Sequence, residues 1–185
     1  MAVTFSESVP MGWQAVDFDL PSIQGDKVSL SDFENKAGLL VVFTCNHCPY
    51  AQAAWPHLVE LNGDYGDEIG VVAINANDDE SEPDDSFENM QEVVDEFGVE
   101  FPYLRDETQE VAHEYGAACT PDAYLFRKVD GGGFELYYHG RINDNWQHPE
   151  LVKERSLELA IESLINEEEP PEEQLPSMGC SIKWK

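Results

Sequence analysis

Residues 38–49 read Gly-Leu-Leu-Val-Val-Phe-Thr-Cys-Asn-His-Cys-Pro, and this stretch decides the fold. Its first six residues form a continuous apolar run of the kind found in strands that are covered on both faces. A helical pattern follows from about Cys48. Two thiols spaced Cys-x-x-Cys at a strand-to-helix junction can form and break a disulfide, and free N–H groups at the helix start favour a thiolate. The stretch therefore predicts a redox-active pair, Cys45 and Cys48.

The rest of the chain indicates an α/β domain built around this strand. A second apolar run at residues 69–75 follows the helix at 48–62, and a connection of that length predicts two parallel strands. The other expected elements are a hairpin within 16–30, a helical turn with a capping box at 31–34, a helix at 87–97, a strand at 101–104, a helix at 107–115, a hairpin of 124–127 with 134–139, and a helix at 151–165. Residues 77–85 are expected to form an exposed acidic loop.

We expect one domain over residues 1–165, followed by a tail at 166–185. Residues 166–174 are acidic and contain prolines, which is typical of a linker. Residues 175–185 regain apolar character and are expected to dock back on the domain.

Acidic residues outnumber basic ones by 38 to 10, which gives a formal net charge of −28. A basic footprint for nucleic acid is therefore not expected. The longest apolar runs are shorter than the roughly 18 residues that indicate a membrane span. The first residues show no basic region followed by an apolar one, so we expect no signal peptide, no membrane partner and a cytoplasmic location.

The acidic residues occur in nearly every expected element, which fits an adaptation to salt better than one docking face. At molar salt the Debye length is about 3 Å, so self-repulsion among these charges is largely screened. We therefore expect a protein of a halophile that accumulates salt.

Four motifs give the chain a resemblance to a known family. They are Phe-Thr-Cys-Asn-His-Cys-Pro-Tyr (43–50), Phe-Pro-Tyr-Leu-Arg-Asp-Glu (101–107), Tyr-Gly-Ala-Ala-Cys-Thr-Pro-Asp (115–122) and Gly-Cys-Ser-Ile-Lys-Trp (179–184). With the order of elements, they resemble the thioredoxin fold in its AhpC/TSA (redoxin) branch, and within it a peroxiredoxin-like subgroup. The resemblance implies a mixed central sheet flanked by helices, with an N-terminal hairpin and an inserted helix and strand.

The resemblance also implies roles for the cysteines. Cys45 would be the attacking thiol and Cys48 the resolving one. The residues agree with these roles: Cys45 is nearest the helix N-terminus and is expected to be the more exposed and more acidic sulfur, while Cys48 lies inside the first turn. It implies a cis peptide at Thr120-Pro121, opposite the pair, where an extended substrate segment could bind. Cys119 would then lie near Cys45, either as a third redox thiol or as a small buried side chain. Cys180, in the tail, could resolve a disulfide or simply pack.

His47 is a candidate for tuning the reduction potential of the cysteine pair. An imidazolium beside a thiolate would stabilise the reduced form and make the pair more oxidising. Replacing His47 with a neutral residue is therefore expected to lower the reduction potential. The alternative is a surface histidine without such a role.

The sequence favours a thiol–disulfide oxidoreductase that acts on disulfide-containing proteins or small thiols and is reset by a reductant, with no cofactor. One alternative is a thiol peroxidase that uses Cys45, although the Pro-x-x-x-Thr-x-x-Cys pattern of peroxiredoxins is missing. Another is a metal-binding protein with Cys45, Cys48 and either His47 or Cys119 as ligands. The strand before the motif carries no carboxylate, so the proton acceptor for Cys48 is unassigned.

Overall fold

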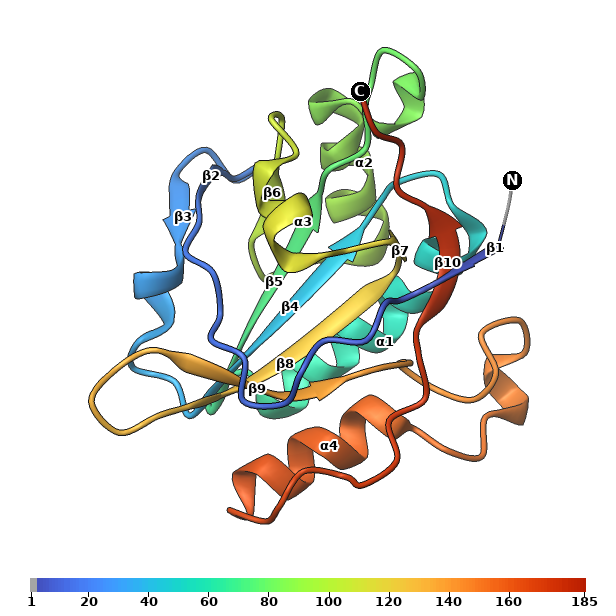
Figure 1. Cartoon of the computed structure of the whole chain (residues 1–185). Helices are drawn as coiled ribbons and strands as arrows, with labels where there is room; N and C mark the ends of the chain where they lie inside the picture. Colours follow the sequence, from blue (N-terminus) through green and yellow to red (C-terminus); the bar gives the residue numbers. More distant parts are fainter. Residues whose placement is uncertain (1–2) are drawn as a thin grey trace.

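A five-stranded mixed sheet forms the centre of the protein (Figure 1). The structure is a computed structural model that describes residues 3–185, so the first two residues of the expected domain lie outside it. The strand order is β6-β5-β4-β8-β9, with β4 parallel to β5 and antiparallel to β8. The strands are β4 (Gly38–Thr44), β5 (Ile69–Asn75), β6 (Tyr103–Arg105), β8 (Asp122–Lys128) and β9 (Phe134–His139). The predicted mixed sheet is confirmed.

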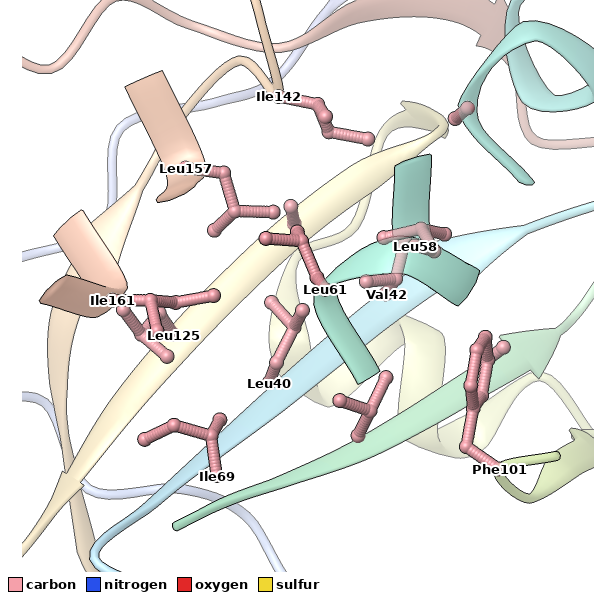
Figure 2. Packing of buried hydrophobic residues seen from close by; sticks show 14 of the residues in the cluster. Leu40, Val42, Leu58, Leu61, Ile69, Phe101, Leu125, Ile142, Leu157 and Ile161 are labelled. Atoms are coloured by element: carbon pink, nitrogen blue, oxygen red, sulfur yellow. The ribbon is translucent and has the colours of Figure 1, made fainter. Parts of the chain in front are cut away.

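One face of the sheet is covered by three helices, α1 (Pro49–Tyr65), α2 (Phe87–Phe97) and α4 (Ser156–Ile165). Successive strand side chains point to opposite faces, so Leu40 and Val42 pack on this side, with Leu58 and Leu61 of α1 (Figure 2). All are buried, and burying each aliphatic side chain contributes about 1.5–3 kcal/mol. This packing fixes α1 against β4.

The opposite face is covered by α3 (Glu110–Tyr115) and by the N-terminal segment with its hairpin of β2 (Asp19–Pro21) and β3 (Lys27–Ser29). Leu39, Val41 and Phe43 pack on this side. Continuous apolar strands are thus explained by two covered faces. The hairpin and the inserted α2 and β6 agree with the sequence prediction.

The predicted helical turn at 31–34 exists, but its capping box was placed two residues too late. The turn is a 3-10 helix at Leu30–Phe33, with Ser29 as its N-cap. Asp32 accepts the backbone N–H of Ser29 at 2.7 Å. Ser29 is the last residue of β3 and is still extended, so the turn starts where the hairpin ends.

A second, three-stranded sheet joins both ends of the chain to the centre of the molecule. Its order is β1-β10-β7, formed by β1 (Val3–Phe5), β10 (Met178–Ser181) and β7 (Cys119–Thr120), all antiparallel. Figure 1 shows β10, in red, beside the start of α1. Cys180 lies opposite Thr120 in the register. The tail therefore reaches the region of the cysteine pair.

Within residues 3–185, no helix is both long and apolar enough to cross a membrane. Two further 3-10 turns occur, at Pro83–Asp85 and Pro149–Leu151. The turn at Pro83–Asp85 ends in the buried residue Asp85.

Candidate functional site

Helix α1 begins one residue later than the sequence pattern indicated, and this changes the role of Cys48. Cys48 is the N-cap residue, with φ −70° and ψ 127°, and Pro49 is the first helical residue. A proline disfavours the helical conformation of the residue before it and is itself favoured at the first helical position. Cys48, rather than Cys45, therefore sits at the point where the free N–H groups of the helix converge.

Both thiols are fully buried, so the expectation that Cys45 is the more exposed one is wrong. Cys45 Sγ lies 3.2 Å from the hydroxyl of Thr120. Cys48 Sγ lies 3.5 Å from the carbonyl oxygen of Thr120, which accepts the S–H when this thiol is protonated. The residue before the proline thus contacts both sulfur atoms. All four cysteines are reduced thiols.

The expected order of acidity is also reversed. A hydrogen bond from the Cys45 thiol lowers the pKa of Cys48, helped by the thiol of Cys180 and by the backbone N–H groups of Ala51 and Cys180. The same hydrogen bond, burial and the charge of Asp85 raise the pKa of Cys45. Cys48 therefore has the lower pKa of the two thiols and loses its proton before Cys45 does. The hydrogen bond from Cys45 is the main cause, and the N-cap position of Cys48 adds the backbone N–H of Ala51.

Asp85 is the main site residue that the sequence did not reveal. Residues 77–85 were expected to form an exposed loop, but Asn77 and Asp78 are buried and Asp85 is fully so. One carboxylate oxygen of Asp85 accepts the backbone N–H of Asn46 at 2.7 Å, and the other accepts the side-chain amide of Asn77 at 2.6 Å. A buried carboxylate does stand beside the motif, although it comes from this loop and not from the preceding strand.

Two further contacts hold the loop at residues 77–85 and the Cys-x-x-Cys motif in place. The buried guanidinium of Arg105 donates to the carbonyl oxygen of Asn77 at 2.7 Å. The hydroxyl of Tyr103 donates to the side chain of Asn46 at 2.8 Å, and burial raises the pKa of Tyr103 far above its usual range. Arg105 therefore fixes the loop at residues 77–85, and Tyr103 fixes the segment between the two cysteines.

His47 lies between two carboxylates. Its Nδ1 is 2.8 Å from Asp85, and its Nε2 is 3.9 Å from Glu82. Its side chain is 15% exposed, so it is not a freely solvated surface residue. Cys45 Sγ, a ring nitrogen of His47 and a carboxylate oxygen of Asp85 all lie within 4.8 Å of one another. An imidazolium here would offset the charge of Asp85 next to the thiols.

Replacing His47 with glutamine is expected to lower the reduction potential of the pair. Without the ring, the carboxylate of Asp85 acts unopposed and disfavours a thiolate. The expected change is about 30 mV, roughly tenfold in the exchange equilibrium. Equilibration with glutathione buffers measures it, with His148→Gln, an exposed histidine, as the control. An unchanged potential rejects the electronic role.

Replacing Asp85 with asparagine is expected to lower the pKa of Cys45, because its charge is one of the causes that raise it. In a Cys48→Ser background, the pH midpoint of Cys45 alkylation should fall by roughly one pH unit, which means faster alkylation at pH 7. Asp84→Asn makes the same charge change on the exposed neighbour and serves as the control. A midpoint that shifts equally in both variants contradicts a local effect of Asp85.

The peptide bond between Thr120 and Pro121 is cis, as the resemblance implied. Cys119, one residue earlier, is buried, and its Sγ contacts the carbonyl oxygen of Pro121 at 3.7 Å. Burial raises the pKa of Cys119 far above its usual range. It lies outside the cluster formed by Cys45, Cys48, Ala51 and Cys180. The structure thus gives Cys119 a packing position and brings Cys180 to the pair.

An apolar cavity of about 190 Å³ opens beside Pro121. Tyr50 and Trp146, whose ring centroids are 3.9 Å apart, contribute to its wall. Phe5 of β1 and Met178 of β10 also line it. A cavity of this size next to a cis-proline suits an apolar side chain of an extended segment.

A metal ion would find a different donor set from the one expected. The three groups within 4.8 Å are Cys45, His47 and Asp85, so neither Cys48 nor Cys119 belongs to this set in the described part of the chain. Nδ1 of His47 is already paired with Asp85. Thiolate, imidazole and carboxylate are zinc ligands, but here they are arranged as a hydrogen-bonded pair beside a thiol.

The fold and a Cys-x-x-Cys pair facing a cis-proline define a class, the thioredoxin-fold dithiol proteins. Residues 11–131 match the AhpC/TSA family, and the chain belongs to this family. A curated relative, the thiol-disulfide oxidoreductase ResA of Halalkalibacterium halodurans, is 31% identical over 129 residues, which are 66% of this chain and 69% of that protein. The predicted family and the thioredoxin fold are confirmed.

Two solved structures resemble the whole chain. An uncharacterized conserved protein from Geobacillus kaustophilus has a TM-score of 0.92 and 42% identity, covering 100% of this chain and 97% of that one. A hypothetical protein from Sinorhizobium meliloti 1021 has a TM-score of 0.91 and 37% identity, covering 98% of both chains. These likenesses extend over the tail, which the family match at 11–131 does not reach.

Proposed function

We propose that Cys45 and Cys48 carry out thiol–disulfide exchange with disulfide-containing proteins or small thiols. The chain is an enzyme of the thiol–disulfide oxidoreductase class, the class that its ResA relatives are named for. The observation that carries the proposal is the pair of buried thiols that both contact Thr120, the residue before the cis-proline. Thiol–disulfide exchange needs an attacking thiolate and a second thiol that resolves the mixed disulfide.

The reaction consumes one substrate disulfide, R1–S–S–R2. The proton on Cys45 moves to Cys48, and the Cys45 thiolate attacks one sulfur of the substrate. The mixed disulfide Cys45–S–S–R1 forms, and R2–S⁻ leaves and takes the proton. Cys48, again a thiolate, then attacks Cys45 Sγ and releases R1–S⁻, which is protonated by solvent. The substrate gains two electrons and the protein loses two as its disulfide closes.

The donors around Cys48 influence the direction of exchange. Because they stabilise its thiolate, they stabilise the reduced form and make the disulfide easier to reduce. A low pKa also makes Cys48 a good leaving group when an external dithiol attacks Cys45. We propose such a dithiol as the reductant that resets the pair.

Purified protein should reduce insulin disulfides in molar salt with a dithiol as electron source. Hydrogen peroxide consumption is measured beside it. Peroxide turnover without disulfide reduction overturns the proposal in favour of a peroxidase. The structure offers little support for that alternative, because Arg105, Arg127 and Arg141 pair with Glu107, Glu135 and Glu154 respectively.

We further propose that the protein works in the cytoplasm of a salt-accumulating cell, which its charge of −28 supports. Carboxylates that repel one another in dilute buffer are screened at molar salt. Fractionation of native cells tests the location: recovery of the protein in the membrane or exported fraction contradicts it.

The melting temperature should rise between low salt and molar potassium chloride. We expect an increase of about 5–10 °C, equivalent to about 2–3 kcal/mol for a chain of this size. Thermal unfolding followed by circular dichroism measures it, with an equal concentration of a neutral osmolyte as the control. Equal melting temperatures at low and at molar potassium chloride reject the halophilic adaptation.

A further inference from the structure

Strand β10 occupies the backbone edge that a substrate segment would be expected to use. It pairs with β7 directly before the cis-proline, and Cys180 is opposite Thr120. An extended peptide that binds by strand addition uses the same kind of backbone hydrogen bonds. A Cβ atom at Gly179 would lie 2.0 Å from the carbonyl oxygen of Thr120, so this close approach requires glycine. The tail is thus seated where a substrate cysteine would be presented.

Cys180 makes direct contact with the dithiol. Its side chain is 3% exposed and packs in one cluster with Cys45, Cys48 and Ala51. Its thiol and its backbone N–H both hydrogen-bond to Cys48. Cys48 is therefore the thiol that hydrogen-bonds to both of the others, Cys45 and Cys180.

We propose that Cys180 is a third redox thiol, which exchanges with the Cys45–Cys48 disulfide to form a Cys48–Cys180 disulfide. This inference rests on the proposed function, because that reaction supplies the first disulfide. Cys180 attacks Cys48 Sγ, the bond between Cys45 and Cys48 breaks, and the proton of Cys180 passes to the leaving Cys45. One disulfide is lost and one is formed, so no external oxidant or reductant is needed.

The exchange would return Cys45 to a thiol while the oxidising equivalents stay in the protein. Cys48 is the sulfur that both neighbours already contact, so only short side-chain movements within the cluster are needed. The strand register fixes Cys180 at this place, because β10 is paired on both sides, with β1 and with β7. Packing alone would not require a thiol that donates to Cys48.

The test isolates the second exchange partner in a Cys45→Ser variant. Reduced full-length protein is incubated with glutathione disulfide, remaining thiols are alkylated, and the digest is mapped by mass spectrometry. We expect a linked peptide pair containing Cys48 and Cys180, and expect it also in the Cys45→Ser/Cys119→Ser control. In Cys45→Ser/Cys180→Ser, Cys48 should instead keep its glutathione. Glutathione that stays on Cys48 in Cys45→Ser, with Cys180 alkylated, overturns the inference.

Wild-type protein separates this failure from a failure of the proposed function. Oxidised wild type should contain two disulfides, Cys45–Cys48 within one peptide and Cys48–Cys180 as a linked peptide pair, and Cys180→Ser should contain the first alone. If wild type reduces insulin and contains Cys45–Cys48 alone, the proposed function stands and the third thiol is rejected. If no disulfide involves Cys45 or Cys48, the proposed function itself fails. Circular dichroism shows that each variant is folded.

Discussion

Replacing Cys45 with serine is expected to lower the turnover of disulfide substrates by on the order of 10³-fold or more, the scale at which loss of a nucleophile is felt. A hydroxyl in place of the thiol cannot form the mixed disulfide. Cys48→Ser should stop turnover as well, but at a later step, because the mixed disulfide on Cys45 then lacks its resolving thiol. Insulin reduction measures the loss, and intact-protein mass spectrometry detects the trapped adduct.

Cys119→Ser is the matched control, because Cys119 is equally buried but outside the cluster. It should keep near wild-type turnover. Trapping of substrate on Cys48 in the Cys45→Ser variant, with full turnover of Cys48→Ser, would contradict the assignment of Cys45 as the attacking thiol. This comparison is needed because the pKa of Cys48 is the lower one, and a thiolate is the form that attacks a disulfide.

Replacing Gly179 with valine is expected to loosen β10 and expose the dithiol. The new side chain would meet the carbonyl group of Thr120, which is backbone and cannot rotate away. Overpacking of this kind costs about 1–3 kcal/mol, which enlarges the locally opened population roughly 5- to 150-fold. Alkylation of the native, reduced protein should accelerate by a similar factor.

The control is Gly63→Val, which makes the same change at an exposed position in α1 with no atom within 4 Å of the new Cβ. Its alkylation rate should match that of wild type. A Gly179→Val protein that is alkylated no faster than the control would show that β10 does not limit access to the thiols.

The parts of the fold that could be predicted are those where local pattern and packing agree. Strands β4 and β5 are continuous apolar runs because both faces of the sheet are covered, so sequence alone located them. The Cys-x-x-Cys motif could be placed because it follows such a strand directly. The predicted order of acidity and exposure of Cys45 and Cys48 is wrong, although Pro49 already indicates that the helix begins after Cys48.

Other parts of the site depend on contacts between distant residues. Asp85 lies in a strongly acidic stretch, and only its pairing with Asn46 and His47 distinguishes it from its solvated neighbours. Strand β10 is four residues long and follows a linker-like stretch, so its pairing with β7 is set by tertiary structure. No periodicity in the sequence encodes such contacts, which explains why Asp85 and the pairing of β10 with β7 were not predicted, although residues 175–185 were expected to dock on the domain.

Strand β10 and the buried carboxylate of Asp85 together change the expected pKa values and accessibility of Cys45 and Cys48. The hydrogen bond between the two thiols, burial and the charge of Asp85 raise the pKa of Cys45. The same hydrogen bond, the thiol of Cys180 and the helix start lower the pKa of Cys48. While β10 is paired with β7, the two thiols are therefore buried, and the lower pKa belongs to Cys48 rather than to Cys45. A substrate that displaces β10 would remove two of the donors to Cys48, which would favour transfer of the negative charge towards Cys45.

The most direct measurement is a redox titration of the full chain in glutathione buffers at molar salt, with each cysteine mapped by mass spectrometry. A redox pair predicts that Cys48 becomes protected from alkylation in one two-electron transition and is recovered on reduction. Cys45 is protected in the molecules that hold Cys45–Cys48, and Cys180 in those that hold Cys48–Cys180. Cys119 should remain a thiol throughout. If Cys45 and Cys48 stay alkylatable across the whole range of potentials, the chain is not a dithiol oxidoreductase.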